Sequence, residues 1–356
     1  MADVTQVEEA LPTFAAEPPA CVAVIGTGSW GTAAAGLIAK RSQRCILWGR
    51  DEAVCAHITR AHVNPRHLTS YQLPDNVSAT TDFSTVGRAA DALVLAVPSR
   101  YLRDTLKALS PHRAKDVPTL VLTKGIEPIT GALMTDIVSQ ELISAYAPAA
   151  LSGPNHAEEI SAGSYAAAVV ASQDPACAAY FQRLVCQENF RVYTSTDIIG
   201  VEASAAIKNV IALACGVAVG LGAGDNTLAA LMTRGVAEMG RLVTALGGDP
   251  LTCMGLAGMG DLVATCTSRH SRNRSFGEAF AKGQSLEAYQ ARTSMVVEGA
   301  AAAQSIFELS QKLDIEAPIT SVVHAILYEG LALDEAIATL LNRRVRNEFY
   351  GFDTKE

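Results

Sequence analysis

The beginning of the sequence lacks positive charge. Its first twenty residues contain no lysine or arginine and carry four carboxylates, at Asp3, Glu8, Glu9 and Glu17, which is the opposite of the basic start of an export signal. The chain also lacks a long apolar run, since its longest, residues 210–224, holds four glycines and is shorter than the ~20 residues that a membrane span needs. We therefore expect a cytoplasmic protein with no integral membrane segment.

The usual patterns of metal sites and disulfide frameworks are missing as well. The eight cysteines are scattered along the chain, none of them forms a C-x-x-C motif, and no histidines cluster at ligand spacing. Such usage is typical of reduced thiols packed inside a cytosolic protein. We predict neither a metal site nor a disulfide framework.

Basic residues are outnumbered by acidic ones in the chain as a whole. The 356 residues include 28 lysines and arginines against 36 aspartates and glutamates, a formal net charge of −8, which argues against nucleic acid as a partner. Only 18% of residues are charged and 49% are hydrophobic, so a mainly disordered chain is excluded. The length corresponds to about two domains.

Short apolar runs alternate with longer segments over the first half of the sequence. The runs are typical of strands buried on both faces of a sheet, and they fall at residues 21–25, 45–48, 92–97, 119–123, 166–171 and 190–194. Segments such as 32–40 and 101–109 are long enough for crossover helices. This order predicts an open parallel α/β sheet with helices between its strands.

The strand signals stop at about residue 196. Beyond it the sequence is rich in Ala, Leu, Glu and Met at helical spacing, which predicts an all-helical second domain. We expect a flexible tail over residues 1–19, a sheet domain over 20–196, a helical domain over 197–345 and a C-terminal tail over 346–356.

A glycine-rich turn follows the first predicted strand and opens an alanine-rich helix. It reads Gly26-Thr-Gly28-Ser29-Trp30-Gly31, a G-x-G-x-x-G in the context that gives this motif meaning. Gly26 permits a tight turn, Gly28 lets a pyrophosphate approach the backbone, and Gly31 allows close helix–strand packing. The turn predicts a dinucleotide site, the alternative being an ordinary strand–helix connection.

The ribose-reading position, about twenty residues further on, falls at Arg50 and Asp51. Asp51 could accept a hydrogen bond from the 2′-hydroxyl of NAD, whereas Arg50 could meet the 2′-phosphate of NADP. The pattern leaves the choice between the two cofactors open.

Polar residues stand at the predicted carboxyl ends of later strands, where open α/β sheets bind ligands. Lys124 ends one strand, and the Gly-Pro turn of residues 152–159 includes Gly153 and Asn155. We interpret both as site candidates. The alternatives are a lysine that reaches solvent and a plain connecting turn.

Lys208 interrupts an apolar helical stretch. It is flanked by Ala-Ala-Ile on one side and, after Asn209, by Val-Ile-Ala-Leu-Ala on the other. Burying an ammonium group is costly unless it is paired or functional, and burial or a second cation would lower its pKa toward that of a proton donor near neutrality. A lysine snorkelling from a half-buried helix is the alternative.

A glycine cluster at residues 255–260 precedes Asp261, and Ser271-Arg272-Asn273-Arg274 follows. Asp261 could hold a lysine or a substrate hydroxyl. The second group could form an anion site from a helix N-terminus and one guanidinium; since two residues apart do not share a helix face, we expect only Arg272 or Arg274 to reach the ligand. The alternative is a solvated basic turn.

Together these segments resemble the bacterial NAD(P)-dependent glycerol-3-phosphate dehydrogenases over residues 21–345. The resemblance rests on eight motifs in the same order: the glycine turn, Thr123-Lys-Gly-Ile, Ser152-Gly-Pro, Ala206-Ile-Lys-Asn-Val, Thr233-Arg-Gly-Val-Ala-Glu-Met, Gly255-Leu-Ala-Gly-Met-Gly-Asp-Leu, Thr265-Cys-Thr-Ser with Ser271-Arg-Asn-Arg, and Val297-Glu-Gly. It implies an N-terminal Rossmann-type domain, a C-terminal helical domain and a site between them.

The resemblance also implies an activity and its residues. The reaction would be reversible reduction of dihydroxyacetone phosphate to sn-glycerol 3-phosphate with NADH or NADPH, for phospholipid synthesis, by an enzyme that is often a homodimer. Cofactor contacts would come from Ser29, Trp30, Arg50, Lys124, Ala157, Arg272, Val296 and Glu298. Substrate contacts would come from Lys124, Gly153, Lys208, Asp261, Ser271, Arg272 and Asn273, with Lys208 as proton donor.

Two positions depart from the pattern of these enzymes. Asn155 stands where many members carry Ser or Thr, and Asp51 stands where a second basic residue would favour NADP. Two other functions compete with this one. A related ketopantoate or β-hydroxyacid reductase would not need the Ser-Arg-Asn-Arg turn for a phosphate, and a non-enzymatic dinucleotide sensor would not need Lys208, Asp261 and Lys124 together.

Overall fold

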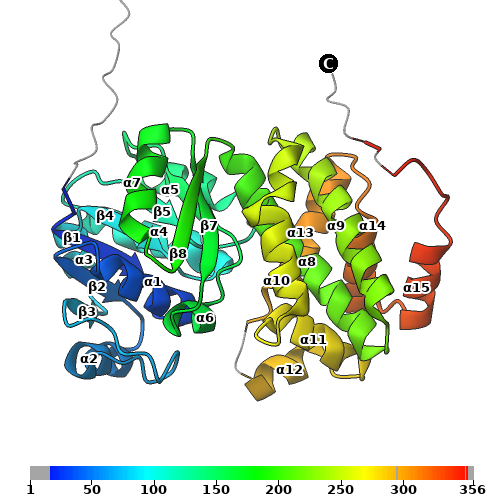
Figure 1. The fold of residues 1–356 in the computed structure, drawn as a ribbon, viewed down its shortest axis with the longest axis horizontal. Helices are drawn as coiled ribbons and strands as arrows, with labels where there is room; N and C mark the ends of the chain where they lie inside the picture. Colours follow the sequence, from blue (N-terminus) through cyan, green and yellow to red (C-terminus); the bar gives the residue numbers. More distant parts are fainter. Residues whose placement is uncertain (1–16, 294–295, 349, 352–356) are drawn as a thin grey trace, which may run out of the picture.

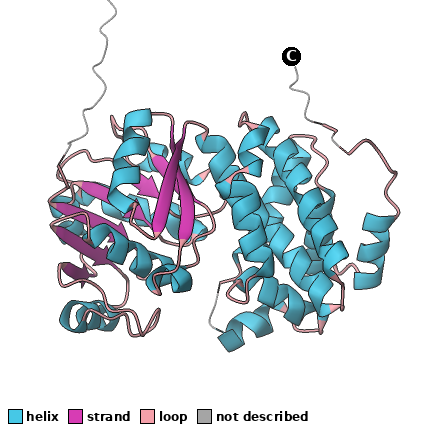
Figure 2. Cartoon of the chain, in the orientation of Figure 1, coloured by secondary structure: helices cyan, strands magenta, loops and turns pink. Residues whose placement is uncertain are grey.

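The structure, a computed structural model, describes residues 17–293, 296–348 and 350–351. Most of the two predicted tails, residues 1–16, 349 and 352–356, therefore lies outside the described residues. The strands gather in one half of the molecule and the other half is helical, as Figures 1 and 2 show. The predicted class, a Rossmann-type sheet domain followed by a helical domain, is confirmed.

One eight-stranded sheet forms the N-terminal half, in the order β3-β2-β1-β4-β5-β6-β7-β8. Its strands are β1 (Cys21–Ile25), β2 (Arg44–Trp48), β3 (Val77–Thr80), β4 (Ala92–Leu95), β5 (Thr119–Val121), β6 (Ala149–Ser152), β7 (Ala166–Ser172) and β8 (Phe190–Ser195). The helices beside it are α1 (Ser29–Ala39), α2 (Glu52–Ala61), α3 (Phe83–Ala89), α4 (Leu102–Leu109), α5 (Met134–Glu141), α6 (Ala157–Ser161) and α7 (Pro175–Val185).

Helices cover both faces of this sheet. Along β1, Val22 and Val24 pack into one hydrophobic cluster, whereas Ala23 and Ile25 pack into another on the opposite face. Successive side chains of a strand point to opposite faces, so a strand buried on both sides reads as a continuous apolar run. That is why residues 21–25 were recognisable from the sequence.

The prediction of a parallel sheet is wrong in one respect. Strand β7 runs antiparallel to β6, and β8 follows the direction of β7. The segment between β6 and β7 contains only the five-residue helix α6, which is too short for a crossover helix, and antiparallel neighbours need no such crossover. Strands β3 and β6 were missed as well: β3 is a half-exposed edge strand, and β6 has one large apolar side chain.

The described residues after β8 form no further strand. Their α-helices are α8 (Ile198–Gly220), α9 (Asp225–Ala245), α10 (Asp261–Thr267), α11 (Arg272–Ala281), α12 (Leu286–Thr293), α13 (Glu298–Lys312), α14 (Pro318–His324) and α15 (Leu333–Leu341). A π-helical turn, Leu256–Gly260, leads directly into α10, and a second, Ala325–Glu329, follows α14.

Helix α8 is the centre of this half and packs against α9, α10, α11 and α13. It is long and apolar enough to cross a membrane by length and composition alone, because it begins before the apolar run seen in the sequence, yet 78% of its most apolar window is buried inside the protein. We interpret it as a core helix. All eight cysteines are free, and every one except Cys186 is buried.

Candidate active site

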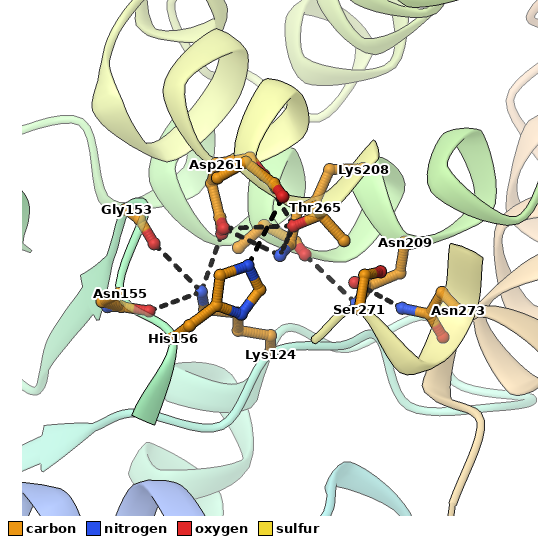
Figure 3. A network of polar contacts seen from close by, with 12 residues as sticks. Lys124, Gly153, Asn155, His156, Lys208, Asn209, Asp261, Thr265, Ser271 and Asn273 are labelled. Atoms are coloured by element: carbon orange, nitrogen blue, oxygen red, sulfur yellow. Dashed lines mark hydrogen bonds and ion pairs between the residues drawn. The ribbon is translucent and has the colours of Figure 1, made fainter. Parts of the chain in front are cut away.

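A buried cluster of charges joins the two halves of the molecule. The carboxylate of Asp261, the first residue of α10, lies between two ammonium groups, with Lys124 Nζ 2.7 Å from its Oδ2 and Lys208 Nζ 2.8 Å from its Oδ1. Lys124 follows β5 in the sheet domain, whereas Lys208 lies in the middle of α8 (Figure 3). Three sequence-predicted site residues thus meet in one network.

Lys208 occupies an almost completely buried position, with 5% of its surface exposed. Its Nζ also donates a hydrogen bond of 2.7 Å to Thr265 Oγ1. The pKa of Lys208 is lowered to about 8: burial is the main cause, the charge of Asp261 opposes the shift, and the positive charge of Lys124 adds to it. The side chain is therefore an ammonium group able to lose its proton near neutral pH.

The same two cations decide the charge of Asp261. Burial raises the pKa of this carboxyl group, but Lys124 and Lys208 outweigh that effect and the net pKa lies below its ordinary value. Asp261 is ionised at neutral pH. The cluster therefore contains one negative charge shared by two positive ones, with a net positive charge left for an anionic ligand.

Lys124 also reaches the turn after β6. Its Nζ donates to Asn155 Oδ1 at 3.2 Å and to the carbonyl oxygen of Gly153 at 3.4 Å. The Nδ2 of Asn155 is buried and has no hydrogen-bond partner among the described residues. Asn155 thus has a free donor available to a ligand.

A second, adjacent network surrounds the start of α11. Asn273 Nδ2 donates to Asn209 Oδ1 at 2.9 Å, and Asn273 Oδ1 accepts the backbone N–H of Gly299 at 2.8 Å. The Oγ of Ser271 accepts the N–H of Arg274 and caps the helix. The side chains of Ser271 and Asn273 are therefore used to position the helix N-terminus beside Lys208.

Two glycines allow α11 to approach α8 this closely. A Cβ at Gly277 would collide with the carbonyl oxygen of Leu213 in α8, and a Cβ at Gly216 would collide with that of Arg274. Backbone therefore lies against backbone where the two helices meet. The contact places the N-terminus of α11 next to the middle of α8, which carries Lys208 and Asn209.

The two arginines of the turn differ in their surroundings. Arg274 forms an ion pair of 2.9 Å with Glu278 on its own helix. Arg272 is exposed, and its guanidinium lies near His67 of the sheet domain, whose pKa is lowered mainly by burial and then by Arg272 and Arg66. Arg272 therefore lies close to the sheet domain, although it is not bonded to the Lys208 cluster.

The glycine turn has the geometry of a dinucleotide cradle. A Cβ at Gly31 would collide with the carbonyl oxygen of Gly26, whereas a Cβ at Gly28 would meet nothing within 4 Å. No side chain caps the N-terminus of α1, which begins at Ser29, so its N–H groups can bind an anion. The Nε1 of Trp30 is buried without a partner among the described residues. These features fit a pyrophosphate.

The remaining predicted cofactor residues lie around this turn and the charged cluster. Ala157 is the buried first residue of α6 and packs in the same cluster as α1. Arg50 follows β2 and its guanidinium lies 5.3 Å from the ring centroid of Tyr101. Glu298 begins α13 and acts electrostatically on Lys208, while Val296 precedes that helix and is half-buried.

Sequence reasoning missed several residues of this region. Thr265 was recognised as part of a motif but given no role, although it lies four residues after Asp261 and hence on the same helix face. The Nε2 of His156 lies 3.4 Å from the carbonyl oxygen of Ala264, and its ring lies beside the cluster in Figure 3. Among the described residues, no group of three or more His, Cys, Asp or Glu side chains could hold a metal ion.

Comparison with protein families agrees with the geometry. Residues 21–178 match the model of the NAD-dependent glycerol-3-phosphate dehydrogenase N-terminus, and residues 197–338 match that of its C-terminus. The chain is 46% identical to glycerol-3-phosphate dehydrogenase [NAD(P)+] of Thermobifida fusca over 332 residues, which is 93% of this chain and 99% of the relative. It is 41% identical to that of Shouchella clausii over 330 residues, 92% of this chain and 97% of the relative.

Solved structures give the same assignment. Glycerol-3-phosphate dehydrogenase from Coxiella burnetii superposes with a TM-score of 0.87 at 35% identity, covering 92% of this chain and 99% of that one. A ketopantoate reductase from Ralstonia eutropha reaches 0.56 at 21% identity, covering 86% and 97%, which shows a shared fold alone. The chain belongs to the NAD(P)-dependent glycerol-3-phosphate dehydrogenase family.

Proposed function

We propose that this chain reversibly reduces dihydroxyacetone phosphate to sn-glycerol 3-phosphate, with Lys208 as the proton donor. The observation that carries the proposal is the buried Lys124–Asp261–Lys208 cluster. A lysine whose pKa is lowered to about 8 combines a protonated state at neutral pH with a readily released proton, which suits a general acid.

Each residue of the cluster has a distinct part in this proposal. The bound nicotinamide cofactor supplies the hydride. Lys208 stabilises the negative charge that grows on the carbonyl oxygen and delivers its proton there, Lys124 adds positive potential, and Asp261 holds both ammonium groups in place. Gly153 and Asn155 would contact the substrate beside Lys124.

The substrate phosphate would bind at the start of α11. The free N–H groups of the helix N-terminus and the exposed guanidinium of Arg272 form an anion site, with Ser271 and Asn273 fixing its position. Arg272 is favoured over Arg274 because Arg274 already pairs with Glu278. Binding energy at the phosphate would position the distant carbonyl group.

The cofactor would lie along the carboxyl edge of the sheet. Gly26, Gly28 and Gly31 would admit its pyrophosphate to the N-terminus of α1. The other proposed cofactor contacts are Ser29, Trp30, Arg50, Lys124, Ala157, Arg272, Val296 and Glu298.

We also propose the wider setting of the enzyme. The domain boundary lies at residues 196–197, because β8 ends at Ser195 and α8 begins at Ile198. The enzyme acts in the cytoplasm as a homodimer, and its product supplies phospholipid synthesis. Gel filtration with light scattering tests the dimer directly.

An assay with two substrates tests the reaction. Oxidation of NADH and NADPH is followed with dihydroxyacetone phosphate and, in parallel, with ketopantoate. We expect oxidation with dihydroxyacetone phosphate and none above background with ketopantoate. Activity with ketopantoate alone would overturn the proposal.

A further inference from the structure

A buried asparagine connects the glycine turn to a loop that the sequence did not single out. Asn64 is fully buried, and its Nδ2 donates to the carbonyl oxygen of Thr27 at 2.9 Å and to Thr32 Oγ1 at 2.8 Å. Its Oδ1 accepts the backbone N–H groups of Arg66 and His67 at 3.0 and 3.1 Å. The backbone at Arg66 is therefore fixed relative to the proposed cofactor site.

From this fixed backbone the side chain of Arg66 reaches the ribose-reading position. Its Nη2 lies 2.7 Å from Asp51 Oδ2, while Asp51 Oδ1 accepts the N–H of Val54 as the N-cap of α2. Both carboxylate oxygens of Asp51 are thus engaged within the protein. The acidic residue that, in the sequence, opposed an NADP preference is neutralised by a neighbour fifteen positions along the chain.

The position of this pair relative to the glycine turn is set by the sheet. Strand β2 pairs with β1 so that Trp48 lies opposite Ile25, and the N–H of Gly26 donates to the carbonyl oxygen of Trp48 at 2.8 Å. The residues that follow β2, Arg50 and Asp51, therefore emerge beside the turn. Arg50, the residue before Asp51, is exposed, and its guanidinium lies over the ring of Tyr101.

We propose that Arg66 determines cofactor choice, and that it makes the chain prefer NADP over NAD. The inference rests on the proposed dinucleotide site. A 2′-phosphate would be repelled by a free carboxylate at position 51, whereas two guanidinium groups can bind it through charge-assisted hydrogen bonds. The Arg66–Asp51 pair is largely solvent-exposed, with 64% and 34% of the two side chains accessible. The pair engages Arg66 through Nη2, so the other N–H groups of its guanidinium can donate to a phosphate while Asp51 stays neutralised.

Calorimetric titration with two adenosine fragments tests the proposal without relying on turnover. The probes are 2′,5′-ADP and 5′-AMP, which differ by the 2′-phosphate. The native protein binds 2′,5′-ADP more tightly. Arg66→Ala weakens binding of 2′,5′-ADP by about tenfold or more, the loss expected for one charge-assisted contact, and changes 5′-AMP binding by less than about twofold.

Arg60 provides a matched control, because it is an exposed arginine in the last turn of α2. Arg60→Ala removes the same charge and leaves both affinities unchanged. The ratio of kcat/KM for NADPH to that for NADH falls in Arg66→Ala in parallel with the binding data. An unchanged ratio of the two fragment affinities in Arg66→Ala overturns this inference, whereas failure to reduce dihydroxyacetone phosphate with either cofactor overturns the proposed function instead.

Discussion

Asp261 accepts hydrogen bonds from two lysines that come from different halves of the molecule. One of its oxygens lies 2.7 Å from Lys124 and the other 2.8 Å from Lys208. The pairing keeps an ammonium group charged at a position where burial alone would favour its neutral form. The proposed proton donor therefore depends on a residue 53 positions away in the sequence.

The first prediction concerns this donor. Lys208→Ala is expected to lower kcat for reduction of dihydroxyacetone phosphate by ~10²–10⁴, the usual contribution of a general acid. Cofactor affinity, measured by calorimetry, remains within about twofold. Lys282→Ala serves as control, because Lys282 is exposed at the end of α11. Near-normal turnover of Lys208→Ala would refute the assigned role.

The second prediction concerns pH. Since the pKa of Lys208 is about 8, kcat/KM for reduction falls as pH rises through about 8, because the acid form is lost. The reverse reaction needs the base form, and its kcat/KM rises over the same range. Asp261→Asn removes the negative charge that stabilises the ammonium group, so the pH profiles of kcat/KM for both directions shift to lower pH. Profiles that do not shift would exclude Lys208 as the titrating group.

The third prediction separates the two arginines of the phosphate site. Arg272→Ala raises KM for dihydroxyacetone phosphate by about tenfold or more, as expected for loss of a charged phosphate contact. Arg274→Ala changes it much less, because Arg274 pairs with Glu278. Steady-state kinetics on both variants compares them directly. The reverse order of effects would assign the phosphate to Arg274.

The fourth prediction concerns Glu202, a buried carboxyl group of α8. It accepts hydrogen bonds from the backbone N–H of Thr135, at 3.1 Å, and from the Thr135 hydroxyl group. Burial raises its pKa from 4.5 to about 7. The folded state thus retains a proton that the unfolded state releases between these values, and stability falls as pH rises from 4.5 to 7.

Glu202→Gln removes this ionisation. Thermal unfolding at pH 5 and pH 8 is expected to show a smaller loss of stability in the variant than in the native protein, by roughly 3 kcal/mol. Glu287→Gln, at an exposed position of α12, controls for loss of a charge. Identical pH dependence in Glu202→Gln and the native protein would contradict the pKa shift.

The sequence predicted those strands whose burial produces a clear pattern of apolar residues. Strand β1 was recognisable because both of its faces are covered, whereas β3 is half-exposed at the sheet edge and reads as a polar segment. The direction of β7 could not be predicted, because apolar runs in parallel and antiparallel strands look alike. It depends instead on the short connection that precedes it.

The candidate site likewise contains some residues that could be recognised from the sequence and others that could not. Lys208 was recognisable because a charge inside an apolar helix needs a partner, and Asp261 is that partner. Asn64 and Arg66 belong to a polar loop without periodicity, and only the folded chain brings them to the glycine turn and Asp51. Likewise, the ion pair between Asp51 and Arg66 could not be predicted from the residue types alone.

The assignment of Lys124 and Asp261 to separate halves has a consequence for the enzyme as a whole. A fragment ending before α8 would keep the glycine turn but lack Lys208, the proposed proton donor, and a fragment beginning at α8 would keep Lys208 but lose Lys124 and the proposed nucleotide site. Neither piece could catalyse the reaction by itself. Activity would return only when the two fragments associate, so turnover in a mixture of the fragments would measure their association.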